Sequence, residues 1–128
     1  INVFIPKIPS PFPTITGDRD LLLLAVYNLV ENALKFTSED DSIEVRALED
    51  GRSIVIEVAD SGTGIPSDDL TKIFEELYRG SNARGTEGSG LGLALVHRIV
   101  TLHRGGVGVR SSQAEPRGTV FTVRLPRR

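Results

Sequence analysis

The 128-residue sequence predicts an α+β fold, a two-layer sandwich in which one mixed, mainly antiparallel sheet carries about three helices on one face. The first observation behind this prediction is the order of segments: a helix, two strands, a helix, a loop, a helix and two strands. The second is that the strands come in two pairs, each joined by a short connection. The third is the length, which suits one compact domain over residues 1–128 with its own core.

The composition is that of an ordinary soluble globular protein, with 39% apolar and 25% charged residues. A formal net charge of -2 gives no reason to expect nucleic acid as a partner. Cysteine is absent, which excludes disulfides and zinc–thiolate sites. No apolar run approaches the roughly 20 residues that span a bilayer. Methionine is also absent, even at position 1, so we expect the chain to be a piece of a longer protein.

The first 37 residues predict an extended lead-in followed by a helix. Prolines at positions 6, 9, 11 and 13 exclude a helix there, and the early NVFI is a candidate edge strand. Asp18 is placed to cap a helix over residues 19–37, RDLLLLAVYNLVENALKFT. SEDDS then ends that helix, and the acidic run at 39–41 is most simply a solvated loop.

The next segments predict a hairpin and a second helix. The runs SIEVRAL (42–48) and SIVIEVA (53–59) are joined by Glu49-Asp50-Gly51, and the Asp-Gly pair is a strong hairpin signal. In the second run Ile54, Ile56 and Val58 alternate onto one face, as a half-buried strand requires. After the turn DSGTGIP, a short helix near SDDLTKIFEEL has Ser67 as its predicted N-cap.

The last third predicts a loop, a helix and a second hairpin. Residues 79–90 are polar and rich in glycine, which predicts a mobile loop. A helix should restart near Leu91 and end at Gly105. The strand-like runs GVGVRS and TVFTVRL then flank QAEPRG. No internal repeat or low-complexity segment is visible.

A polar stripe on the first helix is the first candidate site. At about 100° per residue, four polar residues fall within roughly a quarter of the circumference: Asn28, Glu31, Asn32 and Lys35. The simpler interpretation is a face turned toward water. However, such faces usually carry Lys, Glu, Gln and Arg rather than two asparagines. Amide oxygens are suitable ligands for Mg²⁺, and a lysine one turn on could meet phosphate.

The turn DSGTGIP is the second candidate. Asp60 follows a buried strand directly, with Gly62 and Gly64 next to it. An ordinary turn explains these residues as well as a functional site does. In the functional interpretation, a carboxylate at the end of a rigid strand accepts a proton from an adenine amino group. The glycines then let a planar ligand approach the backbone.

The segment GSGLGLAL (88–95) is the third candidate, because its glycines precede a helix and converging backbone N–H groups there suit phosphate. It is neither a dinucleotide fingerprint nor a Walker A loop, and a flexible hinge explains it equally well. Arg79 and Arg84 beside it could close over a polyphosphate. His97 and His103 belong to no visible triad or metal cluster, so structural roles are favoured for both.

Taken together and in order, five segments resemble the conserved boxes of bacterial sensor histidine kinases. These segments are NLVENALKFT, DSGTGI, IFEELYRG, GSGLGLAL and RGTVFTVRLP, which resemble the N, G1, F, G2 and terminal boxes. The resemblance covers about residues 17–126 and extends to the superfamily of gyrase, the heat-shock chaperone and the mismatch-repair ATPases. The segment IFEELYRG is the part that indicates a histidine kinase in particular.

The resemblance implies a Bergerat-type sandwich in which ATP lies between helices and sheet under a mobile lid. Asn32 would be the Mg²⁺ ligand with Asn28 supporting it, and Glu31 would orient these amides. Lys35 would contact phosphate. The catalytic set would be Asn32, Lys35 and Glu31. The implied ATP-binding set is Asn28, Asn32, Lys35, Phe36, Asp60, Gly62, Gly64, Ile65, Tyr78, Arg79, Arg84, Gly88, Ser89, Gly90, Leu91, Gly92, Leu93 and Thr119.

The resemblance also has departures. Leu77 stands where the family usually has a second phenylalanine in the F box, from which we expect a small change in lid packing. The family's phospho-acceptor histidine precedes an acidic residue on a dimerising helix pair, whereas His97 and His103 both precede arginine. The chain is therefore expected to be the ATP-binding catalytic domain alone. It would pass the γ-phosphate to a histidine on a separate dimerisation domain and serve a response regulator indirectly.

Further expectations follow from the same resemblance. The parent would be a membrane-anchored homodimer, and this piece would be a monomeric cytoplasmic domain. One alternative is an anti-sigma-type serine kinase of the same superfamily, against which the F box argues. A second is a regulatory module that binds nucleotide without turnover.

Overall fold

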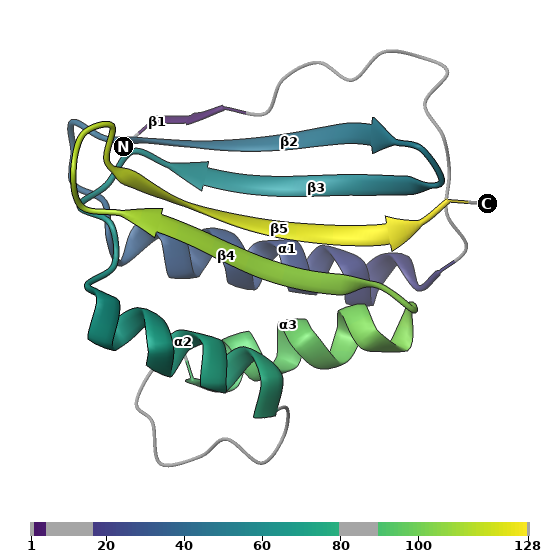
Figure 1. Ribbon diagram of the computed structural model, residues 1–128. Helices are drawn as coiled ribbons and strands as arrows, with labels where there is room; N and C mark the ends of the chain where they lie inside the picture. The colour runs from purple at the N-terminus through teal and green to yellow at the C-terminus, as the bar shows by residue number, and fades with distance from the viewer. Residues whose placement is uncertain (1, 5–16, 80–89, 128) are drawn as a thin grey trace.

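The computed structural model describes residues 2–4, 17–79 and 90–127 (Figure 1). The strands are β1 (Asn2–Phe4), β2 (Ser42–Asp50), β3 (Ser53–Asp60), β4 (Gly106–Ser112) and β5 (Gly118–Pro126). The helices are α1 (Arg19–Leu34), α2 (Ser67–Arg79) and α3 (Gly90–Leu102). The predicted order of elements is confirmed. The predicted mobile loop falls almost wholly outside the described residues.

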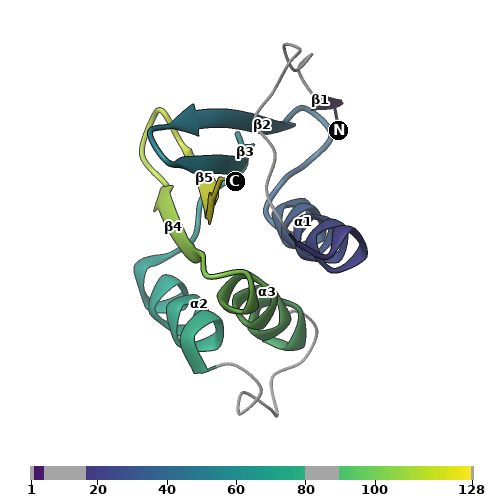
Figure 2. The same ribbon diagram turned by 90° about the vertical axis from the view of Figure 1, so that its right-hand side faces the viewer.

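The strands form one five-stranded sheet in the order β1-β2-β3-β5-β4. β1 pairs parallel with β2, and every other pairing is antiparallel. Seen along the strands, the three helices form a second layer on one face of the sheet (Figure 2). The predicted α+β sandwich is therefore confirmed, including the early edge strand at NVFI.

The core lies between the two layers. Val58, Phe121 and Val109 stand directly opposite one another on β3, β5 and β4, and all three are buried. Leu29 of α1 and Val96 of α3 are fully buried against this face. Alternate residues of these three strands therefore point to the helices, as a half-covered sheet requires.

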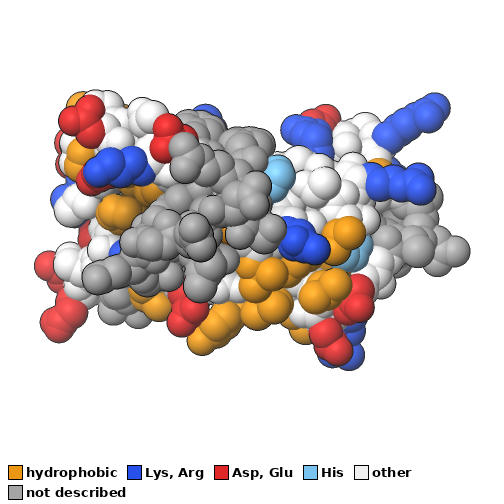
Figure 3. All heavy atoms as spheres, turned by 90° about the horizontal axis from the view of Figure 1, so that it is seen from below, with side chains coloured by type: hydrophobic (Ala, Val, Ile, Leu, Met, Phe, Trp, Pro, Cys, Tyr) orange, Lys and Arg blue, Asp and Glu red, His pale blue; other side chains and the backbone are white. Residues whose placement is uncertain are grey.

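The helix face also keeps apolar side chains in contact with solvent. Figure 3, which views the molecule from the helix side, shows hydrophobic side chains gathered on it. The exposed ones are Leu23, Leu24, Tyr27 and Leu34 on α1 and Leu102 on α3. Among the described residues, no helix combines the length and the hydropathy that a membrane span needs.

The first helix begins as expected and ends early. Asp18 caps it, because its Oδ1 accepts a hydrogen bond from the Leu21 N–H at 3.1 Å. The helix ends at Leu34, three residues before the predicted Thr37. A turn then takes over, in which the Ser38 N–H donates to Asp41 Oδ2 at 2.8 Å.

Two other local predictions are shifted by one residue. Asp50 pairs with Ser53, so Gly51 and Arg52 form the two-residue turn, and Gly51 has φ 61° at the first turn position. Ser67 is the first residue of α2 rather than its N-cap. The Leu70 N–H donates to the Pro66 carbonyl at 2.8 Å instead.

The end of α3 uses a different residue from the one expected. Arg104, with φ 65°, takes the left-handed conformation that ends the helix, one residue before the predicted stop at Gly105. The Arg104 N–H donates to the Thr101 carbonyl, and the Gly105 N–H donates to the Val100 carbonyl, both at 2.9 Å. This pair of bonds is a Schellman motif, which satisfies the last carbonyls of the helix.

His103 joins this end of α3 to the start of α1. Its Nε2 accepts a hydrogen bond from the Asp18 N–H at 2.9 Å, and its Nδ1 donates to the Ile99 carbonyl at 2.8 Å. The ring is therefore the Nδ1–H tautomer and fixes two helix ends together. The structural role favoured for His103 is confirmed.

The two ends of the described chain lie at opposite ends of the sheet (Figure 1). Asn2 pairs with Ser42, next to the end of β3. The Arg127 N–H donates to the Arg52 carbonyl at 2.8 Å, beside the turn between β2 and β3.

Candidate functional site

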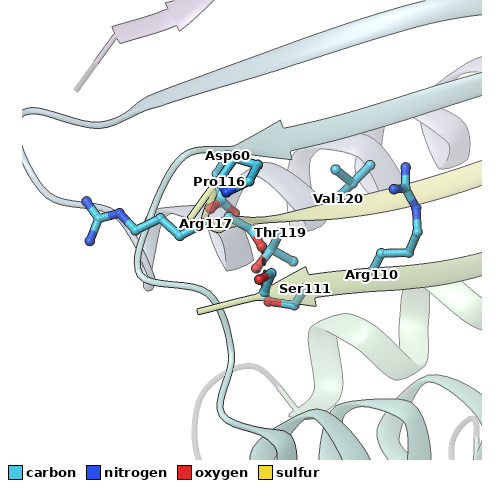
Figure 4. A pocket seen from close by; sticks show the side chains of 9 residues that line it. Asp60, Arg110, Ser111, Pro116, Arg117, Thr119 and Val120 are labelled. Atoms are coloured by element: carbon cyan, nitrogen blue, oxygen red, sulfur yellow. Dashed lines mark hydrogen bonds between the residues drawn. The ribbon is translucent and has the colours of Figure 1, made fainter. Parts of the chain in front are cut away.

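A row of three polar side chains crosses the sheet where β3, β5 and β4 meet one end of the molecule (Figure 4). Asp60 stands opposite Thr119, and Thr119 stands opposite Ser111. The hydroxyl oxygens of Ser111 and Thr119 are 2.7 Å apart. Asp60 and Thr119 are buried, although both are polar. A pocket of about 310 Å³ is lined by this row together with the β4–β5 connection.

Asp60 carries the clearest sign of a missing partner. Its Oδ1 accepts a hydrogen bond from the Gly62 N–H at 2.9 Å, whereas its Oδ2 is buried and has no partner among the described residues. Burial raises the pKa of Asp60, and the nearby Asp41 charge raises it further, against backbone N–H groups of Gly62 and Thr119 that lower it. Buried carboxylate oxygens normally have a donor, so Oδ2 fits a ligand amino group.

The backbone of the loop after Asp60 packs closely against two other segments of the chain. A β-carbon on Gly62 would overlap the Phe36 carbonyl, which accepts the Thr63 N–H at 2.9 Å. Gly64, with φ 80°, lies as closely against the Ser112 carbonyl. The G1 segment therefore joins the end of α1 to the end of β4.

The polar stripe of α1 is divided between core and solvent. Asn32 is only 3% exposed, and its Nδ2 is buried without a partner among the described residues. Glu31 and Lys35 are exposed. The simple interpretation of a face turned toward water is therefore wrong for Asn32 and right for Glu31 and Lys35. The Glu31 carboxylate accepts the Tyr27 hydroxyl at 3.3 Å.

Asn28 connects the stripe to the glycine segment of α3. Its Nδ2 donates to the Leu24 carbonyl one turn back, at 2.9 Å. Its Oδ1 lies beside Gly92, where an added β-carbon would be 3.2 Å away. The N-box and G2 segments, separated by about 60 residues in the sequence, therefore come into contact.

These amides can be tested for their fit to Mg²⁺. Magnesium takes oxygen ligands, and both asparagines offer one on adjacent turns of α1. The unpartnered Asn32 atom is a nitrogen, but half a rotation of the amide puts Oδ1 in its place. A buried amide that has no protein partner is what a metal or phosphate ligand would require. The donor set therefore fits Mg²⁺ bound to a triphosphate.

The other expected site residues divide into three groups. Phe36 is half-buried and packs against the core, while Ile65 and Leu93 are buried within it, so Leu93 could reach a nucleotide only through its backbone. Gly90 is the first residue of α3, which puts Gly90 and Gly92 in the first turn of a helix. The side chains of Tyr78, Arg79, Leu91 and Leu77, and all of Arg84, Gly88 and Ser89, lie outside what the structure describes.

Sequence analysis missed an ion pair beside the site. Asp41 is only 4% exposed and accepts from Arg117 Nη2 at 3.0 Å, so its assignment to a solvated loop is wrong. The Ser38 N–H, more than any other group, holds the pKa of Asp41 below its usual value. The pair joins the turn after α1 to the β4–β5 connection. The one signal in the sequence was Ser38, three residues before Asp41. An aspartate at that spacing can close a turn by accepting the backbone N–H of the serine.

Ser111 was also missed. Its hydroxyl accepts the Ile65 N–H at 2.7 Å and contacts Thr119 Oγ1 as well. It therefore joins the G1 segment to the polar row of the sheet. A serine inside a strand has no local pattern that marks it, so the sequence alone could not single it out.

Comparison with known proteins identifies the family of this chain. Residues 17–128 match the family model described as histidine kinase-, DNA gyrase B- and HSP90-like ATPase. The chain is 36% identical over 123 residues to the adaptive-response sensory kinase SasA of Synechococcus elongatus, covering 95% of this chain and 31% of that protein. It is 40% identical over 115 residues to the signal transduction histidine-protein kinase BaeS of Escherichia coli, covering 88% and 24%.

Solved structures give the same result. The mycobacterial sensor histidine kinase MprB matches with a TM-score of 0.71 at 32% identity, covering 99% of this chain and 82% of that one. Full-length ShkA, solved in complex with AMPPNP, matches with a TM-score of 0.76 at 33% identity, covering 98% and 25%. The chain spans about a third or less of the length of the curated relatives named above. It belongs to the family of histidine kinase-, DNA gyrase B- and HSP90-like ATPases, and within that family it corresponds to the catalytic domain of sensor histidine kinases.

Proposed function

We propose that this domain binds Mg²⁺–ATP and donates the γ-phosphate to a histidine on a separate dimerisation domain. The observation that carries the proposal is the buried, unpartnered Asp60 Oδ2 in a pocket-lining row at the end of the sheet. A 6-amino group of adenine would donate to this oxygen. The family membership and the AMPPNP bound to the relative ShkA support the same ligand class.

The triphosphate would extend from that row toward α1 and the start of α3. Asn32 would hold the metal through its amide oxygen, and Asn28, which is bonded to the Leu24 carbonyl and lies beside Gly92, would support it. Backbone N–H groups at the start of α3 and the exposed Lys35 would face the phosphates. When bound at Asn32 and Asn28, Mg²⁺ would neutralise part of the charge of the phosphates.

In the transfer, an imidazole nitrogen of the acceptor histidine would attack the γ-phosphorus in line with the bond to the β-phosphate oxygen. That bond would break, and ADP would leave with its electron pair. The contribution of this chain would be positioning and charge neutralisation. Glu31 already accepts the Tyr27 hydroxyl and is exposed, so we assign the proton acceptor to the partner domain.

The first test is calorimetric titration of ATP with and without Mg²⁺. We expect Asn32→Ala to abolish the gain in affinity that Mg²⁺ gives the wild type. Asn32→Asp has an oxygen at both positions of the side-chain end. It should still bind ATP more tightly with Mg²⁺ than without it. If Asn32→Ala binds Mg²⁺–ATP as the wild type does, the metal assignment is wrong.

The second test is transfer in trans. A separately made histidine-bearing dimerisation domain, mixed with this chain and ATP, should gain an acid-labile phosphate. Acid-stable phosphate on serine would favour the anti-sigma-type kinase instead. ATP binding without transfer to any acceptor would favour a regulatory module.

We further propose that this domain is monomeric and lies in the cytoplasm, and that its parent is a membrane-anchored homodimer that serves a response regulator. The acceptor domain would supply the dimer contacts. Light scattering of this chain alone should therefore give the mass of one copy, and a stable dimer would contradict this part.

A further inference from the structure

The start of β2 connects the edge strand β1 to the segment that follows Asp60. On one side, β1 pairs in parallel with β2, and Val3 stands opposite Ile43 (Figure 1). On the other side, the Ser42 N–H donates to Ser61 Oγ at 2.9 Å, and the Ser61 N–H donates to the Ser42 carbonyl at 3.0 Å. Because backbone groups alternate along a strand, Ser42 faces Ser61 and the next residue faces β1.

Ser61 is the residue at which the chain leaves the sheet. In a regular hydrogen-bonded antiparallel pair, the two residues exchange N–H to carbonyl bonds in both directions. Here the Ser61 hydroxyl takes the place of the Ser61 carbonyl as the acceptor for Ser42. The side chain therefore keeps this residue on β2 while the backbone turns into the G1 segment. Ser61 lies between Asp60 and Gly62, whose N–H donates to Asp60 Oδ1 at 2.9 Å, so it is part of the turn that holds this carboxylate.

The strand β1 has two arrangements open to it, paired and separated. It is three residues long and lies at the edge of the sheet. A strand with so few backbone hydrogen bonds can separate from its neighbour without unfolding the rest of the sheet. Ile43 is fully buried and stands opposite Asp60, so a shift at the start of β2 acts directly on the end of β3.

We propose that β1 regulates the nucleotide site, and that Ser61 is the positioning residue that couples the two. Pairing of β1 fixes the start of β2, the two bonds between Ser42 and Ser61 fix the turn after Asp60, and that turn then binds ATP more tightly. Anything that draws β1 away from β2 lowers the affinity for ATP. Coupling between two sites is reciprocal, so bound ATP strengthens the pairing of β1. This inference rests on the proposed function, because it concerns the same site.

A double-mutant cycle, measured by calorimetric titration of Mg²⁺–ATP, tests the coupling. Val3→Pro weakens the pairing of β1, because proline has no N–H to donate to a ladder. We expect it to lower the affinity for ATP about fivefold, the lower end of ordinary coupling between sites. Ser61→Ala removes the hydroxyl and should itself lower the affinity. In the Ser61→Ala background, Val3→Pro should then change the affinity less than about twofold.

Two further backgrounds serve as controls. Ser61→Thr keeps the hydroxyl and should keep the full effect of Val3→Pro. Ser53→Ala removes a hydroxyl from the other end of β3, where Ser53 stands opposite Asp50, and should keep that effect as well. If Val3→Pro lowers the affinity equally with and without the Ser61 hydroxyl, Ser61 is only structural and the proposal fails.

Hydrogen exchange gives a second test that needs no substitution, and it decides the matter if a variant does not fold. ATP should slow the exchange of the amides at residues 2–4 and 43 more than at residues 48–50, the far end of β2. Equal slowing at both ends would mean general stabilisation alone and would contradict the coupling. A wild type that binds no ATP contradicts the proposed function itself, whereas ATP binding that Val3→Pro leaves unchanged overturns this inference alone.

Discussion

The two ends of this sandwich satisfy their polar groups to different degrees. At the end where α1 starts and α3 stops, His103 accepts the Asp18 N–H, and the Schellman motif satisfies the last carbonyls of α3. At the opposite end, Asp60 Oδ2 and Asn32 Nδ2 are buried without partners among the described residues. Both ends are built from the same helices and strands.

This difference indicates which end is structural and which is functional. Unpaired buried groups cost free energy, so a protein keeps them where a ligand completes them. The closed end gives the helices a fixed geometry, which lets the open end hold its groups in position. Five substitutions would break or sharpen the comparison, from the largest expected effect to the smallest.

Gly62→Ala should have the largest effect, because a β-carbon there overlaps the Phe36 carbonyl. We expect a loss of about 2–4 kcal/mol in the free energy of unfolding, as for overpacking against rigid backbone. Urea denaturation measures it. Gly108→Ala is the control, because a β-carbon there meets nothing within 4 Å. A Gly62→Ala protein as stable as the control would show that the G1 segment is loosely held.

His103→Ala should remove about 1.5–3 kcal/mol of stability, because two hydrogen bonds between helix ends are lost. ATP affinity of the folded protein should stay unchanged, since the closed end lies away from the proposed site. Leu102→Ala is the neighbouring control: Leu102 is 66% exposed, so its removal should be nearly neutral. A large loss of ATP affinity in His103→Ala would contradict the division into two ends.

Asp60→Asn should do the opposite, raising stability at pH 7 by about 1 kcal/mol while weakening ATP binding. The pKa of Asp60 is raised in the fold, so the native state holds more protons than the unfolded chain just above the ordinary Asp range. Its contribution to stability therefore falls as the pH rises through that range. Asp60→Asn should remove this slope in thermal melts taken across acidic pH.

Asp41 should contribute a dependence of stability on pH of the opposite sign, and it serves as the comparison. Its pKa is lowered by the Ser38 N–H and by Arg117, so its stabilisation is present at neutral pH and is lost as the pH falls below the ordinary Asp range. Asp41→Asn should make the protein less stable at neutral pH and less sensitive to acid. If both variants changed the slope in the same direction, the two environments would have been assigned wrongly.

Arg124→Ala should have the smallest effect, about 0.5 kcal/mol or less. Arg124 Nη1 lies 2.7 Å from Asp50 Oδ2, but both side chains are at least half exposed. Exposed ion pairs contribute little to stability, because water and salt screen them. Chemical denaturation at low and high salt checks this, and a loss above about 1.5 kcal/mol would contradict it.

The elements of the fold could be predicted because their signals are local. Asp18 before the first helix, the strand alternation through Val58 and the turn at Gly51 act over a few residues each. Boundaries moved by one to three residues, as at the end of α1, where the Phe36 carbonyl accepts the N–H of the distant Thr63. The Asn28–Asn32 spacing and Asp60 were also local signals, and their meaning came from their order along the chain.

The partners of the site could not be predicted, because they are far apart in the sequence. Asp18 and His103 are separated by 85 positions, Asp41 and Arg117 by 76, and Ile65 and Ser111 by 46. Each pair meets only once the sheet register and the packing of α1 on α3 are fixed. The residues around a serine or an aspartate do not show whether the strand register will bring that side chain into the site.

The placement of the chain ends decides how the domain can be held in an experiment. Asn2 pairs with Ser42 at the same end of the sheet as the polar row, whereas Arg127 is bonded next to the turn between β2 and β3 at the far end of the sheet. A tether or fluorescent label attached after Arg127 would therefore leave the pocket open to nucleotide and to an acceptor domain. The same attachment before Asn2 would put bulk at the end of the sheet that holds the pocket, so surface-based kinetics should use the carboxyl end.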